Sequence, residues 1–278
     1  MEQQIRIRFD DHRFWLLSIA GLLMAFNWYF VEYNLVCLIY WFAALSVTWK
    51  RCNDYNFESD IFSTIIGLIL IFWLLFRGLI ADNHTDVIAR MYPLFSVAAI
   101  LFLSTRASKI FQYWHEILIV SLTGIPWEHI FAILSLTAKI SVLDAKIARL
   151  LLWYIGFDVY QQDNLVVLPT GSIQIAGACS SFNLLGLMWQ SCLVIYLCIA
   201  LTKNQQFLLW LWATVIALGV NSIRLCLMAL LIANDQQAAF DYWHGSSGAE
   251  IFTTIAILLL ALTYWLLVEN KPNFLSNI

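Results

Sequence analysis

Apolar runs of roughly the length that crosses a lipid bilayer, about 20 residues for a helix, recur along the whole chain. Eight can be distinguished, at Phe14–Val31, Leu35–Trp49, Ile61–Ile80, Ala89–Ser104, Ile110–Ile125, Phe182–Leu201, Gln206–Ile232 and Glu250–Val268. Charged residues make up only 12% of the chain, whereas about a quarter of a soluble domain is charged. These features predict an all-α integral membrane protein with about eight transmembrane helices.

Basic residues predict the orientation of these spans, because cytoplasmic loops carry an excess of Lys and Arg. With both termini in the cytoplasm, nine basic residues fall on the inner side and four on the outer side. We therefore expect one polytopic domain over residues 1–278 in the cytoplasmic (inner) membrane. No cleavable signal is expected, because Met1–Arg13 is polar and no small-residue cleavage site follows the first apolar run.

The segment at residues 126–178 interrupts the series of spans and is predicted to be an extracytoplasmic insertion. Within it, Trp127–Gly156 carries charges among apolar residues at helical spacing, which predicts an amphipathic helix on the outer membrane surface that ends at Gly156. A ninth span is the competing interpretation, but four charged side chains would make it costly. The predicted apolar face comprises Ile140, Leu143, Ile147, Leu150, Leu151 and Tyr154.

Short β-type runs follow this helix, with turn residues between them. They lie at residues 159–162, 165–168 and 172–175, and the turns are Asp163-Asn164 and Pro169-Thr170-Gly171. This pattern predicts a small β-meander that delivers the chain to Cys179, just before the sixth span.

Cys179 is a candidate nucleophile. It follows the small residues Ala176, Gly177 and Ala178 and precedes an apolar run, so it should lie at the mouth of a membrane helix. The free amides at a helix start stabilise an anion, which favours a thiolate there. Ser180 is either an N-cap of this helix or a second catalytic group. The other five cysteines are interpreted as buried or idle thiols, with no spacing typical of a zinc site.

Two further side chains are expected near Cys179. Arg224 lies within the seventh apolar run, where a charged residue by default faces the bundle interior and serves function, and Asn221 falls on the same helical face. His244 lies in a predicted loop before the last span. Cys179, Arg224 and His244 stand 18 to 24 residues from the inner ends of their spans. At about 1.5 Å per residue they fall within roughly 10 Å of one depth, at the outer surface.

Together these three residues predict acyl transfer on a peptide bond through a thioester. The thiolate is the attacking form, the imidazole serves as acid and base, and the guanidinium can stabilise an oxyanion. Glu250 could orient the imidazole, or simply be a carboxylate favoured at a helix start. No metal or other cofactor is expected, and the net charge of -3 gives no indication of nucleic-acid binding.

In these residues the chain resembles the exosortase/archaeosortase family of membrane cysteine transpeptidases. The resemblance rests on Ala178-Cys179-Ser180, on Asn221-x-x-Arg224, and on His244 followed by Gly248 and Phe252, and it extends over essentially the whole chain. The chain has Ser181 where the commoner family motif, Cys-Ser-Gly, has glycine. This difference puts the substrate motif in doubt more than the class of reaction.

The resemblance implies that Cys179 is the nucleophile, Arg224 the oxyanion-stabilising or substrate-orienting group, and His244 the acid and base. It further implies that the substrates are exported proteins whose C-terminal sorting tail has a short motif such as Pro-Glu-Pro, one membrane helix and a basic cytoplasmic end. The acyl group would pass to an acceptor, a surface glycan or lipid, on the extracytoplasmic side.

Two other functions are compatible with the sequence. A transporter or flippase would use Arg224 to bind an anionic substrate, although no related halves of the chain are evident. A non-catalytic membrane scaffold would assemble an export or polysaccharide system, and its Cys179 would react like any exposed cysteine.

Overall fold

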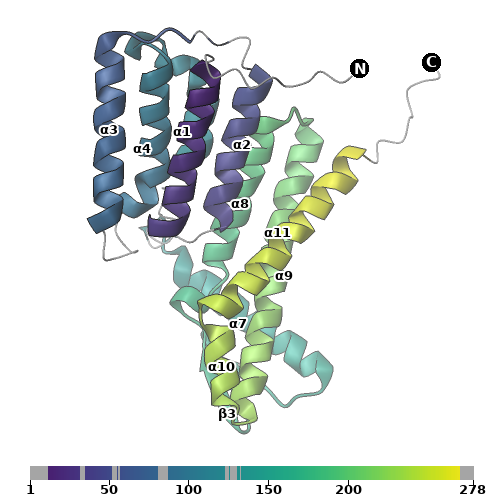
Figure 1. Cartoon of the computed structure of the whole chain (residues 1–278). Coiled ribbons are helices and arrows are strands. Elements are labelled where there is room, and N and C mark those ends of the chain that lie inside the picture. The colour runs from purple at the N-terminus through teal and green to yellow at the C-terminus, as the bar shows by residue number, and fades with distance from the viewer. Residues whose placement is uncertain are drawn as a thin grey trace, which may run out of the picture. The chain divides into compact units, whose positions relative to one another are not determined.

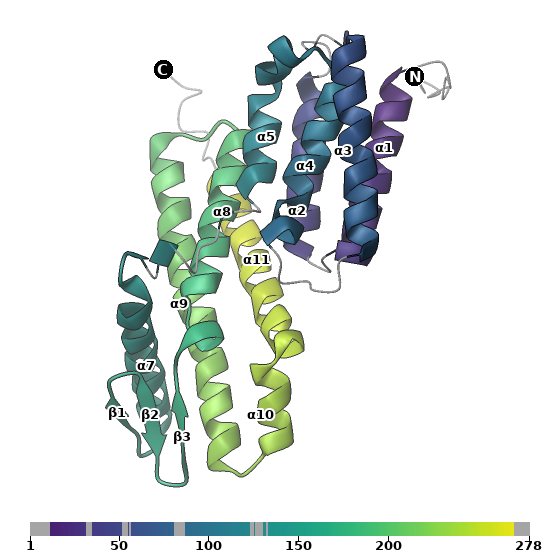
Figure 2. The same cartoon turned by 90° about the vertical axis from the view of Figure 1, so that its left-hand side faces the viewer.

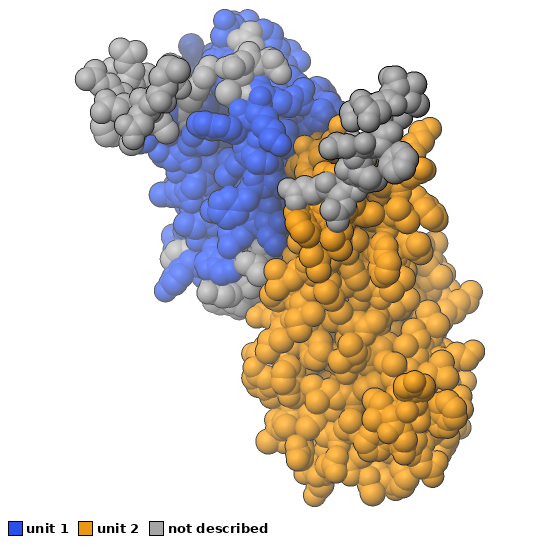
Figure 3. Space-filling model, turned by 90° about the vertical axis from the view of Figure 1, so that its right-hand side faces the viewer, with its two compact units in different colours: residues 1–125 blue, residues 126–278 orange. Residues whose placement is uncertain are grey.

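A computed structural model describes residues 12–31, 35–51, 55, 57–80, 87–122, 125, 130–131 and 133–269. The chain divides into two compact units, residues 1–125 and 126–278 (Figure 3). The prediction of a single polytopic domain, with residues 126–178 as an extracytoplasmic insertion, stays a prediction.

The first unit consists of helices that follow its apolar runs (Figure 1). They are α1 (His12–Phe26) with the π-helical turn η1 (Asn27–Val31), α2 (Leu35–Arg51), α3 (Ile61–Ile80), α4 (Val87–Ser104), the 3₁₀ helix η2 (Ala107–Tyr113) and α5 (Trp114–Ser121). Helix α3 begins where Asp60 accepts the backbone N–H of Ser63 at 3.2 Å, as an N-cap does. The first four predicted spans are thus helical within a few residues of their expected bounds.

The fifth predicted span, Ile110–Ile125, is wrong as a single membrane-crossing helix. The run is divided between η2 and α5, and the eight residues of α5 extend only about 12 Å. The Glu116 carboxylate in α5 is buried and accepts hydrogen bonds from the hydroxyls of Tyr55 and Thr48. A buried carboxylate needs such partners, so α5 is held by polar contacts within the unit.

The second unit has a helical part and a small sheet (Figures 1 and 2). Its elements are α7 (Leu136–Ile155), β1 (Tyr160–Gln162), β2 (Leu165–Leu168), β3 (Gly171–Gln174), the 3₁₀ turn η4 (Gly177–Cys179), α8 (Phe182–Cys198), α9 (Lys203–Ala233), α10 (Gln237–His244) and α11 (Ser246–Glu269). The β-meander predicted before Cys179 is confirmed as an antiparallel sheet of order β1-β2-β3. The helix predicted over residues 127–156 is confirmed only from Leu136, as α7, because the chain turns at residues 134–135, and its place on the outer membrane surface stays a prediction.

Helix α7 ends as predicted at Gly156, which adopts a φ of 102° that favours glycine. The face that packs on the sheet and on α9 consists of small residues and one acid: Ser141, Asp144, Ala145, Ala148 and Leu152. The predicted apolar face lies largely on the outside of the unit, where Tyr154 is 87% exposed. Small side chains let the helix approach its neighbours closely, whereas the large apolar side chains lie on the outer surface of the unit.

Helix α9 organises the second unit. Its 31 residues extend about 46 Å, well beyond the roughly 30 Å of a hydrocarbon core. Its first part packs on α8 and α11, and its last part lies beside α7, β3 and α10 (Figure 2). Arg224 comes 21 residues after Lys203, about 32 Å along the axis, so the arginine lies in the last third of the helix.

Three described helices, α3, α9 and residues Ser246–Val268 of α11, are long and apolar enough to cross a membrane. Shorter apolar helices cover Phe14–Tyr29, Met91–Ser104 and Phe182–Cys198. This supports a multi-pass membrane protein, and the total of eight spans stays a prediction.

Candidate active site

The turn that carries Cys179 is closed by its own backbone. Strand β3 continues through Ile175, whose N–H donates to the Asn164 carbonyl at 2.9 Å, and the chain then turns at Gly177 with a φ of 52°. The N–H of Cys179 donates to Ala176 at 3.2 Å, and that of Ser180 donates to Gly177 at 3.1 Å. The thiol is therefore presented by a defined 3₁₀ turn between the sheet and α8, and Cys179 is only 8% exposed.

Asp144 of α7 fixes the residues that follow Cys179, and sequence reasoning missed this role. Its carboxylate is fully buried and accepts three hydrogen bonds: from the Ser180 hydroxyl at 2.8 Å, from the Ser181 N–H at 2.7 Å and from the Ser181 hydroxyl. Burial raises the pKa of Asp144, and the bonds from the two serines act to lower it. The one available signal was an acid on a helix face otherwise made of Ser, Ala and one Leu.

Neither Ser180 nor Ser181 caps α8, so the N-cap interpretation of Ser180 is wrong. Both hydroxyls donate to Asp144, and α8 begins without a side-chain cap. The amides of residues 179–181 are all engaged by other acceptors, so none of them is directed at the thiol.

Asn221 and Arg224 of α9 hold two separate segments by their backbone oxygens. Asn221 donates from Nδ2 to the Cys179 carbonyl at 3.0 Å. Arg224 donates from Nε to the Trp243 carbonyl at 3.2 Å and from Nη2 to the His244 carbonyl at 3.0 Å. Both side chains are buried, as the sequence predicted for one face of this helix. One turn of α9 thus positions the nucleophile candidate and the histidine relative to each other.

His244 is the last residue of α10, where the sequence predicted a loop. Its ring stacks on Phe240, one turn earlier, with centroids 5.3 Å apart and an angle of 12° between the planes. Gly248 lets α11 start directly against α10, because a Cβ there would lie 2.5 Å from the Trp243 Cα. The imidazole is thereby fixed on one side while the residue stays exposed.

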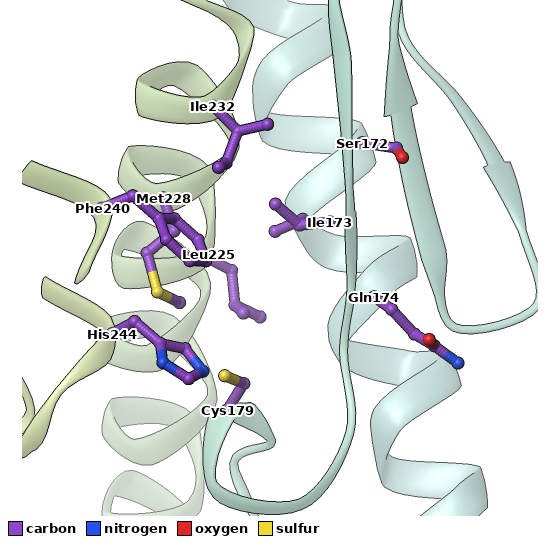
Figure 4. A pocket seen from close by; sticks show the side chains of 9 residues that line it. All are labelled: Ser172, Ile173, Gln174, Cys179, Leu225, Met228, Ile232, Phe240 and His244. Carbon is purple, nitrogen blue, oxygen red and sulfur yellow. The ribbon is translucent and has the colours of Figure 1, made fainter. Parts of the chain in front are cut away.

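Cys179 and His244 line one cavity of about 140 Å³, and Figure 4 shows the thiol and the imidazole pointing toward each other. Its other walls come from β3, α9 and α10: Ser172, Ile173, Gln174, Leu225, Met228, Ile232 and Phe240. Of the nine side chains that line the cavity, only the Cys179 thiol and the His244 imidazole are ionisable. The site is an apolar pocket with a nucleophile and a base at one end.

The sequence predicted a favoured thiolate at Cys179, and the surroundings of the thiol act in the other direction. Burial raises the pKa of Cys179, and the guanidinium of Arg224 acts to lower it, with burial the larger effect. The amides of residues 179–181 do not stabilise a thiolate, because each of them is bonded to another acceptor. A base close to the thiol is then required to generate the attacking form.

Glu250 does not support His244 in this arrangement. It is exposed on the first turns of α11, and its carboxylate takes part in no hydrogen bond or ion pair within the described residues. Among those same residues, no group of three or more His, Cys, Asp or Glu could hold a metal ion.

A protein-family model described as transmembrane exosortase (Exosortase_EpsH) matches residues 28–261, which is most of the chain and includes every residue of the site. No curated protein and no solved structure matches the chain.

Proposed function

Because the chain belongs to the transmembrane exosortase family, we propose that it is a membrane cysteine peptidase and transpeptidase. Its substrates are exported proteins that carry a C-terminal sorting tail of the Pro-Glu-Pro type. The enzyme cleaves off this tail and transfers the remaining protein to a surface glycan or lipid. The observation that carries the proposal is the shared cavity of Cys179 and His244, with Asn221 and Arg224 bonded to the two backbones.

In the first half of the reaction, His244 takes the proton of the Cys179 thiol and the sulfur attacks the scissile carbonyl carbon. The tetrahedral intermediate collapses, the C–N bond breaks, and the imidazolium gives its proton to the leaving amine. The product is a thioester on Cys179 and a released tail. Arg224 supplies positive charge near the developing oxyanion through Nη1, the guanidinium nitrogen that makes no hydrogen bond within the described chain.

In the second half, His244 takes a proton from an acceptor hydroxyl or amine, which attacks the thioester carbonyl. The thiolate leaves, takes the proton and is ready for another cycle. If water replaces the acceptor, the same steps hydrolyse the thioester.

We place this chemistry on the extracytoplasmic side of a cytoplasmic (inner) membrane crossed about eight times, with both termini inside. The distribution of basic residues supports this orientation. The engagement of Arg224 by the carbonyls of Trp243 and His244 weighs against the alternative of a transporter that uses this arginine to bind an anion.

Co-expression with a tail-bearing exported protein tests the proposal. Wild type should shorten the substrate, whereas Cys179→Ala, Arg224→Ala and His244→Ala should leave it almost intact, and mass analysis of the new C-terminus identifies the acceptor. Cys198→Ala, at a half-buried cysteine at the end of α8, is the matched control and should process like wild type. Processing by Cys179→Ala at the wild-type rate would show the mechanism to be wrong.

A further inference from the structure

Strand β3 has a free edge directly upstream of Cys179. Among the residues that the structure describes, it is the outer strand of the sheet and pairs with β2 alone, and the chain reaches the candidate nucleophile five residues after Gln174. Where β3 begins, the edge is closed by α9: the Thr170 hydroxyl donates to the Ala233 carbonyl at 2.7 Å, and a Cβ on Gly171 would lie 2.7 Å from Ile232. The rest of the edge borders the cavity.

The register shows which backbone groups face that edge. Ile175 and Asn164 form a hydrogen-bonded pair, and in an antiparallel ladder such pairs alternate with non-bonded ones. Gln174 opposite Leu165 and Ser172 opposite Val167 are therefore the non-bonded pairs, whose N–H and C=O groups point away from β2. Both residues line the cavity, and within the described chain no backbone hydrogen bond from another element meets them.

The side chains of β3 alternate in a way that suits a peptide ligand. Ile173 points toward Leu225 and Ile232 of α9, while Ser172 and Gln174 point to the opposite side (Figure 4). An extended chain laid along the edge would alternate in the same way, with every second side chain entering the cavity. The cavity is apolar and about 140 Å³, close to the 150 Å³ or so that accommodates a benzene-sized group, so it fits one small apolar side chain.

We propose that the substrate binds by β-strand addition: about three residues on the amino side of the scissile bond pair with Ser172 and Gln174, and one small apolar side chain fills the cavity. This inference rests on the proposed function and specifies how the peptide is recognised. Main-chain pairing gives affinity, the cavity gives selectivity for one position, and the strand guides the scissile carbonyl to Cys179.

Proline substitution tests the pairing, because proline removes one N–H and is tolerated on an edge strand where that N–H points outward. Gln174→Pro should lower kcat/KM about twofold to tenfold, the worth of one lost hydrogen bond, and Gln174→Ala should cleave faster than Gln174→Pro. The matched control is Gln161→Pro on β1, at the opposite edge. Gln161 lies opposite Val166, and the backbone hydrogen bonds of Val166 are made to β3. The N–H of Gln161 therefore also points away from the sheet.

Gln161→Pro also loses two side-chain hydrogen bonds, to Val142 and Asp163, so it perturbs the sheet at least as much as Gln174→Pro. Its kcat/KM should nevertheless stay within about twofold of wild type. Equal losses in Gln174→Pro and Gln161→Pro would overturn the proposal.

A substrate-side experiment decides the matter even if Gln174→Pro fails to accumulate. A synthetic peptide spanning the mapped cleavage point is N-methylated at one residue at a time and offered to the purified wild-type protein. Cleavage should fall about twofold to tenfold at alternate positions on the amino side and change little at the positions between them. Losses without this alternation would contradict strand addition while leaving the peptidase function standing. Failure of the wild type to shorten the tail-bearing protein in cells, the experiment that maps the cleavage point, would refute the proposed function itself.

Discussion

The two parts of α9 differ in how they are buried. Residues 203–220 pack on α8 and α11 through apolar contacts that include Leu209, Ala213 and Ala217. Residues 221–233 pack on α7, β3 and α10, and there Asn221 and Arg224 hold backbone oxygens of Cys179, Trp243 and His244. One helix is thus a packing element in its first part and a positioning element in its last. Asn221 and Arg224 are tolerated as buried polar groups in the last part because each of them has a partner on another segment.

The largest effect is expected from Arg224→Ala. The variant loses the two bonds that hold Trp243 and His244 and the charge beside Cys179, so kcat/KM should fall about 100-fold or more, as a misplacement of about 1 Å can cause. Arg224→Lys restores the charge but not the two-point contact and should recover only a small part. Steady-state kinetics on the purified protein provide the measurement.

The first part of α9 supplies the control for this comparison. Ala213 is fully buried, so Ala213→Leu overpacks the contact with α8 and should cost about 1–3 kcal/mol of stability. Its activity per folded molecule should stay close to that of wild type. If Ala213→Leu lost as much activity as Arg224→Ala, the division of α9 into two roles would be wrong.

A smaller effect is expected from Asp144→Asn. The amide keeps one oxygen but turns an NH₂ toward donors on Ser180 and Ser181, so the turn after Cys179 loses its anchor. We expect kcat to fall about tenfold with little change in KM, because the substrate pocket itself is untouched. Asp158→Asn, at an exposed aspartate, is the matched control. A rise in KM with kcat unchanged would contradict the positioning role.

The smallest effect is a shift in the pH dependence of Cys179 alkylation. Burial raises the pKa of Cys179, so reaction with iodoacetamide should rise through a midpoint above that of an ordinary exposed cysteine. Arg224 acts to lower this pKa, so Arg224→Ala should move the midpoint further up. A midpoint below that of a free cysteine, unchanged in Arg224→Ala, would instead indicate a resting thiolate paired with an imidazolium.

Much of this arrangement could be predicted from the sequence, because apolar period and turn residues are local signals. They located α3 at its observed bounds and the three strands within two residues. The convergence of Cys179, Arg224 and His244 followed from counting residues along the spans. The order of the spans and the position of each residue along its span are enough to predict that these three residues lie at a similar depth, without any knowledge of packing.

What the sequence did not reveal depends on contacts between distant segments. Asp144 was one of four charges in an amphipathic pattern, and its place on a face of mostly small residues is the one local feature that distinguishes it from Lys139 or Arg149. Its partners lie 36 and 37 residues later. The fifth apolar run likewise contains the buried Glu116, whose partner Tyr55 is 61 residues away. Hydropathy averages over such residues and therefore extended the run into one span.

The central claim is that Cys179 carries the acyl group, and trapping that intermediate tests it most directly. The purified protein is mixed with a tail-bearing substrate, quenched in acid during turnover, digested and analysed by mass spectrometry. Our account predicts that the substrate fragment on the amino side of the cut is attached to the peptide containing Cys179 and is released by hydroxylamine, as a thioester is. Turnover that releases the tail with no adduct on Cys179, or with the adduct on another residue, would contradict it.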